Sequence, residues 1–163
     1  MTPNSPQPTA TTVRIVLDTN VVMDMLHFHD ARTNRLEKAI AEGRARCFCD
    51  ANCLAELERV AAYPEFALDR EAQDELMRSY RGFIVMCETA GEEPPPLPRC
   101  SDKDDQKFLE LAARCDAAIL VTRDKQLLKL ARHRHKPPSF TITTAEKAEA
   151  LLELPPENPA PAT

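Results

Sequence analysis

The sequence predicts an α/β fold, in which helices cover both faces of a central, mostly parallel, five-stranded sheet. Short segments of strand character alternate with longer segments whose apolar residues recur at helical spacing, a pattern typical of parallel sheets. The strand segments are mostly apolar, as expected for strands covered on both faces. The chain has 163 residues, enough for one domain with a sizeable core.

β-branched and apolar runs, bounded by turn residues, locate the strands. Val13-Arg-Ile-Val-Leu17 ends at Asp18, and Phe83-Ile-Val-Met-Cys87 begins directly after Gly82. The expected strands are residues 13–17, 45–49, 83–87, 117–121 and 140–143.

Helical periodicity and capping residues locate the helices between the strands. Asp50 has the residue type of an N-cap for a helix that Pro64 stops, and Gly43 ends the helix before it. The expected helices run from the first strand to Leu26, over 31–42, over 50–63, over 69–81, onward from Asp105, over 124–132 and over 144–153.

Proline-rich segments mark the expected limits of the domain. Residues 1–12 and 155–163 are expected to be disordered tails around a folded domain of residues 13–154. The start of the chain lacks the basic and apolar regions of a signal peptide, and no apolar run is long enough to span a bilayer. We therefore expect a cytoplasmic protein that does not contact membranes.

Acidic residues follow the strands at the edge where ligands bind in open α/β sheets. Asp18 comes directly after the first strand, and Asp124 comes three residues after Val121. Asp105 begins a helix whose preceding loop opens at the same edge. Any one of these residues alone would be read as a turn former or N-cap, but together they favour a site.

Glu56 is expected to join this site from the helix after the second strand. It lies beside the apolar stripe of that helix, and a carboxylate at the margin of a core needs a partner. A metal ion would supply that partner. Arg59, three residues further on, is the alternative.

Carboxylates that converge raise one another's pKa, and a hard divalent cation removes the conflict. Oxygen ligands suit Mg²⁺ or Mn²⁺, which can activate water and stabilise the leaving oxygen in phosphodiester cleavage. We therefore expect Asp18, Asp105 and Asp124 to bind metal directly. Glu56 is expected to bind a second ion or to orient the water that attacks phosphorus.

Several nearby polar residues are candidates for a supporting role. Thr19, Asn20 and Thr122 could hydrogen-bond the carboxylates or water, or could equally form turns. Asp102 could reach the pocket or, like Asp104, cap the helix that contains Asp105.

The other residues with metal-binding chemistry favour structural roles. The six cysteines form no C-x-x-C pair, so buried free thiols are preferred over a zinc site at Cys47, Cys49 and Cys53. The net charge of −5 neither supports nor excludes nucleic acid, because bound cations reverse the local sign. The basic segment 125–136 either follows an RNA backbone or faces solvent.

Four segments resemble, in order, the acidic motifs of PIN domains, and together they cover residues 13–153. They are Leu17-Asp-Thr-Asn-Val-Val22, then Ala55-Glu-Leu-Glu-Arg-Val60 with Tyr63-Pro64, then Ser101-Asp-Lys-Asp-Asp-Gln-Lys-Phe-Leu-Glu-Leu-Ala112, and then Ala118-Ile-Leu-Val-Thr-Arg-Asp124 with Leu127-Leu128. Related sequences often have Arg-Asp-Pro at 101–103, Ser or Thr at Asp50 and Gly at Arg123.

The chain is most similar to the PIN-like toxin components of type II toxin–antitoxin modules. This resemblance implies a three-layer α/β/α sandwich and a Mg²⁺- or Mn²⁺-dependent ribonuclease with the quartet Asp18, Glu56, Asp105 and Asp124. It also implies a homodimer that a small antitoxin protein inhibits.

Two other functions remain as alternatives. A non-catalytic module would bind RNA or metal in the same pocket without cutting. A phosphatase with an aspartyl nucleophile ranks last, because such enzymes have a second acid where this chain has Asn20.

Overall fold

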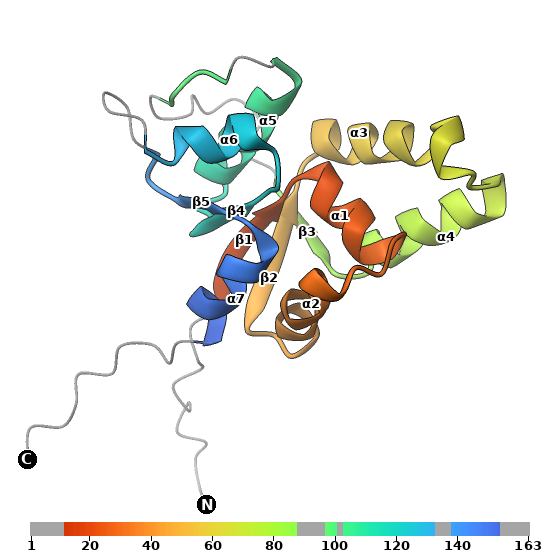
Figure 1. The fold of residues 1–163 in the computed structure, drawn as a ribbon, viewed down its shortest axis with the longest axis horizontal. Coiled ribbons are helices and arrows are strands. Elements are labelled where there is room, and N and C mark those ends of the chain that lie inside the picture. Colours follow the sequence, from red (N-terminus) through yellow and green to blue (C-terminus); the bar gives the residue numbers. More distant parts are fainter. Residues whose placement is uncertain (1–11, 88–96, 101–102, 133–137, 154–163) are drawn as a thin grey trace, which may run out of the picture.

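The computed structural model describes residues 12–87, 97–100, 103–132 and 138–153. One five-stranded sheet has the strand order β3-β2-β1-β4-β5, and all four neighbouring pairs are parallel (Figure 1). The strands are β1 (Val13–Leu17), β2 (Ala45–Cys49), β3 (Ile84–Met86), β4 (Ile119–Val121) and β5 (Thr141–Thr143). The predicted α/β fold and its five strands are therefore confirmed.

Helices connect each strand to the next, close to the predicted positions. They are α1 (Thr19–Leu26), α2 (Asn34–Ala41), α3 (Ala51–Ala61), α4 (Arg70–Arg81), α5 (Lys103–Arg114), α6 (Lys125–Leu130) and α7 (Ala145–Glu153), with 3-10 turns η1 (Ala31–Thr33) and η2 (Pro64–Phe66). The predicted N-cap is confirmed, since the Asp50 side chain accepts a hydrogen bond from the Cys53 amide.

The strand order reverses its direction between β1 and β4. The chain moves outward from β1 through β2 to β3, then returns to the other side of β1 for β4 and β5. Because parallel crossovers are right-handed, the helices after β1 and β2 cover one face, and those after β3 and β4 cover the other. A reversal of this kind is where ligands bind in open α/β sheets.

The register of the sheet aligns the carboxyl ends of the two central strands. Leu17 of β1 lies opposite Val121 of β4, and both side chains are buried. The backbone amide of Asp18 donates to the Val121 carbonyl at 2.9 Å, which continues the pairing past the last residues of the strands. Asp18 and Thr122 therefore leave the sheet side by side.

The cysteines differ in part from the expectation of free thiols. Cys47, Cys49, Cys53 and Cys100 are buried and form no disulfide with a described residue. The expectation is wrong for Cys87 and Cys115, which form a disulfide. The end of β3 and the end of α5 meet with 6.2 Å between the two Cα atoms, a separation that a disulfide spans.

Some expectations concern residues outside the described ranges. Both predicted tails lie outside these ranges, except for Thr12. Asp102 and residues 133–136 of the basic segment also lie outside them. Within the described ranges, every helix is too short or too polar to cross a bilayer.

Candidate active site

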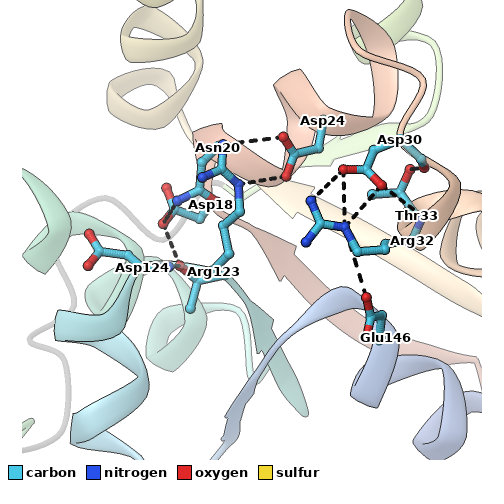
Figure 2. A network of polar contacts seen from close by, with 10 residues as sticks. Asp18, Asn20, Asp24, Asp30, Arg32, Thr33, Arg123, Asp124 and Glu146 are labelled. Atoms are coloured by element: carbon cyan, nitrogen blue, oxygen red, sulfur yellow. Dashed lines mark hydrogen bonds and ion pairs between the residues drawn. The ribbon is translucent and has the colours of Figure 1, made fainter.

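Asp18 occupies the N-cap position of α1, but its side chain does not cap that helix. Its Oδ2 atom instead accepts hydrogen bonds from Thr122 Oγ1 at 2.7 Å and from Asn20 Nδ2 at 3.2 Å. Asn20 and Asp18 lie side by side in Figure 2. The residue is only 4% exposed. A turn or cap would leave this carboxylate in solvent, so its burial points to another use.

Burial raises the pKa of Asp18 to about 6. The hydrogen bond from Thr122 opposes this shift, whereas the charges of Glu56 and Asp124 add to it. Two of the other predicted acids, on α3 and in the loop after β4, thus act electrostatically on Asp18. This arrangement favours a bound cation, which would relieve both the desolvation and the repulsion.

Asp124 lies near Asp18 (Figure 2), and Thr122 forms hydrogen bonds with both residues. The Thr122 hydroxyl donates to Asp18 and accepts from the Asp124 amide at 3.0 Å. Asp124 also caps α6, since its Oδ1 atom accepts from the Gln126 amide at 2.8 Å. The capping role and the placement at the site therefore coexist. Thr122 is fully buried and holds the two acids in register.

Glu56 reaches this edge of the sheet from α3. One carboxylate oxygen accepts a hydrogen bond from Thr19 Oγ1, and the other lies 2.8 Å from Lys107 Nζ. The cationic partner is thus Lys107 on α5, and not the sequence neighbour Arg59. Local helical spacing favoured Arg59, but the packing of α3 against α5 brings Lys107 closer.

Asp105 lies in the first turn of α5, two residues before Lys107. Lys107 pairs with Glu56, so this part of α5 lies close to α3. Asp105 is half-buried and its Oδ2 atom is shielded from solvent. Asp104 is exposed, which fits a solvated position.

The donor chemistry of this edge fits a hard divalent cation. The Oδ1 atom of Asn20 is buried and accepts no hydrogen bond from the described residues, although its amide nitrogen contacts Asp18. An oxygen left in this way beside a desolvated carboxylate is a ready ligand for Mg²⁺ or Mn²⁺. Within the described ranges no group of three or more His, Cys, Asp or Glu side chains could hold a metal ion as these side chains lie, so the structure does not bring the four predicted acids together as one ligand set. The side chains of Thr19, Thr122 and Lys107 hold the acids instead.

A fifth acid, Asp24, lies next to this site and was not anticipated from the sequence. It is 7% exposed on α1 and pairs with Arg123, whose Nε and Nη2 atoms lie 2.7 and 3.3 Å from its oxygens (Figure 2). The pair ties α1 to the loop between Thr122 and Asp124. The available signal was a single acid within the apolar run of α1.

Three comparisons bear on this arrangement. A family model described as PIN domain matches residues 14–126. Comparison with curated protein sequences found no match. One similar solved structure is a chain of VapBC2 from Rickettsia felis, which was crystallised with a DNA fragment from its promoter. It superposes with a TM-score of 0.53 at 14% sequence identity, and the match covers 80% of this chain and 97% of that one. PAE2754 from Pyrobaculum aerophilum superposes with a TM-score of 0.51 at 16% identity, covering 88% and 97%. At such identities the structural likeness shows the fold alone.

Asp18→Asn is expected to stabilise the metal-free protein at neutral pH. The raised pKa means that the folded state binds the Asp18 proton more tightly than the unfolded state does. This contribution to stability is complete below the unfolded pKa near 4 and is lost as pH rises through about 6. In EDTA, urea unfolding should show that wild type and Asp18→Asn are equally stable at about pH 3.5. At about pH 7.5 the variant should be more stable than wild type by about 2–3 kcal/mol. Asp74→Asn, at an exposed position, is the control. A variant less stable than wild type at the higher pH contradicts the interpretation.

Arg123→Ala is expected to destabilise the fold, because it leaves the nearly buried Asp24 carboxylate without its guanidinium. Since Arg123 is half-exposed, the expected loss is about 1–2 kcal/mol, below that for a fully buried pair. Adding Asp24→Asn should recover part of it by removing the charge. The matched control is Arg70→Ala, which removes an exposed ion pair and should change stability by under about 0.5 kcal/mol. Equal effects of the two arginine substitutions in chemical denaturation would argue against a structural role for the Asp24 pair.

Proposed function

The chain belongs to the PIN-domain family, and from this we propose that it is a Mg²⁺- or Mn²⁺-dependent endoribonuclease, the toxin of a toxin–antitoxin module. PIN domains are generally nucleases, that is, hydrolases of phosphodiester bonds. The observation that carries the proposal is the buried Asp18 carboxylate at the reversal between β1 and β4, on which the charges of Glu56 and Asp124 act. A desolvated carboxylate among like charges supports a cation site more than a structural role.

In this proposal Asp18, Asp105 and Asp124 hold the metal ion, and Glu56 is the fourth acid of the catalytic set. The ion supplies a Lewis acid that activates water and neutralises charge on phosphate. Thr122 keeps Asp18 and Asp124 together through its two hydrogen bonds. Thr19 orients Glu56, and Asn20 presents its amide oxygen beside Asp18.

The proposed substrate is RNA, and the proposed location of the protein is the cytoplasm. The proposed partners are a small antitoxin protein and a second copy of this chain. Support for them comes from the similarity of the four acidic segments to toxin components. The fold shared with a chain of VapBC2, a complex solved on promoter DNA, agrees with an antitoxin partner.

A non-catalytic module is the second candidate function, and one observation favours it. Both oxygens of Glu56 are already engaged, by Thr19 and by Lys107. A pocket held in this way could bind RNA or metal without cutting. Cleavage assays separate the two functions.

Wild-type protein with Mn²⁺ is expected to cleave single-stranded RNA, and EDTA is expected to stop the reaction. Asp18→Asn should lower the cleavage rate by at least about 100-fold, because it removes a charged ligand of the proposed metal ion. Each tenfold loss of rate corresponds to about 1.4 kcal/mol of transition-state stabilisation. The fold should remain intact, as circular dichroism can verify. Exposed Asp74→Asn on α4 is the matched control and should cleave like wild type. Full activity in Asp18→Asn would remove the assigned site, and no cleavage by wild type would favour the binding module.

A further inference from the structure

The ion pair between Lys107 and Glu56 lies inside the acidic edge of the sheet. The Nζ atom of Lys107 is 2.8 Å from Glu56 Oε1, and the two side chains are only 19% and 12% exposed. Thr19 donates to the other oxygen of Glu56. Both carboxylate oxygens thus have partners, which come from α5 and α1 while Glu56 itself belongs to α3.

The Lys107 side chain is largely shielded from solvent in this position. Its ammonium lies 5.9 Å from the centre of the Phe108 ring, which is buried. Burial raises the pKa of the Cys53 thiol, and the charge of Lys107 acts on that thiol in the opposite direction. The ammonium therefore lies where α3 and α5 pack together, with the Glu56 carboxylate as its ion-pair partner.

A fixed ammonium and a divalent cation repel each other strongly when they share one carboxylate in a partly buried site. In two-metal nucleases the two ions together stabilise the attacking and leaving oxygens, and a second ion needs carboxylates of its own. Lys107 already balances the charge of Glu56. Asp18, Asp105 and Asp124 are the carboxylates that the proposed function assigns to a single ion.

We propose that the Lys107 ammonium takes the place of a second divalent cation, so that this chain binds one metal ion and uses Glu56 outside its coordination shell. This inference rests on the proposed nuclease function. Held by Lys107 and Thr19, Glu56 is a positioning residue that accepts a hydrogen bond from water near the scissile phosphate. Lys107 is a positioning residue that acts through Glu56.

The test counts Mn²⁺ ions bound to the full chain, by electron paramagnetic resonance of the free ion and by calorimetry. Wild type is expected to bind one ion. Lys107→Met should bind two, and the second should be lost again when Glu56→Gln is added. Lys107→Arg keeps the charge and should bind one. Lys38→Met, at an exposed lysine on α2, is the matched control and should bind one.

Glu56→Gln in the otherwise wild-type chain gives an independent measurement if Lys107→Met does not fold. Because Glu56 is not a metal ligand in this proposal, the variant should bind one Mn²⁺ with an affinity within about threefold of wild type. This corresponds to a change in binding free energy of less than about 0.7 kcal/mol. A loss of binding in this variant would overturn the inference.

The outcomes also separate this inference from the nuclease assignment. Two Mn²⁺ ions in wild type, with cleavage that depends on Asp18, would overturn the single-ion proposal and leave the nuclease intact. Equal counts in wild type and folded Lys107→Met would do the same. No bound Mn²⁺ and no cleavage in wild type would overturn both.

Discussion

The buried carboxylate of Asp18 is the constraint on which the site depends. A charge placed at the carboxyl end of a central strand loses most of its hydration, and burial accordingly raises its pKa to about 6. The hydrogen bonds from Thr122 and Asn20 offset only part of that cost. Such a position persists in a stable fold when another requirement maintains it, and the proposed cation at the reversal between β1 and β4 would supply that requirement.

The sheet explains why this requirement falls on Asp18 and Asp124 together. Leu17 pairs with Val121, so Asp18 and Thr122, which follow them, leave the sheet next to each other. Thr122 then serves both acids with one hydroxyl, donating to Asp18 and accepting from the Asp124 amide. Fixing two like charges side by side disfavours the metal-free state. The same geometry prepares oxygen ligands for a hard cation without further ordering of the backbone.

The sequence was sufficient for the features that depend on local pattern. The apolar runs that end at Leu17 and Val121 predicted two central strands, and the rule for open sheets predicted that Asp18 and Asp124 meet. Contacts between side chains of distant elements could not be predicted in this way. Arg123 and Asp24 are 99 residues apart in the sequence, and the packing of several helices brings them together. For the same reason Lys107 replaced Arg59 as the partner of Glu56, and Cys87 met Cys115.

These distant pairs divide the charges around the site in a definite way. Asp24 has the guanidinium of Arg123, and Glu56 has the ammonium of Lys107. Each pair also joins two elements, α1 to the loop after β4, and α3 to α5. Asp18 lies between them with neutral hydrogen-bond donors, Thr122 and Asn20. Neutral donors orient a carboxylate without cancelling its charge, so Asp18 keeps the full attraction for a divalent cation. The two basic side chains thus join the elements around the site, and the proposed metal ion would offset the net negative charge of −5 for a phosphate substrate.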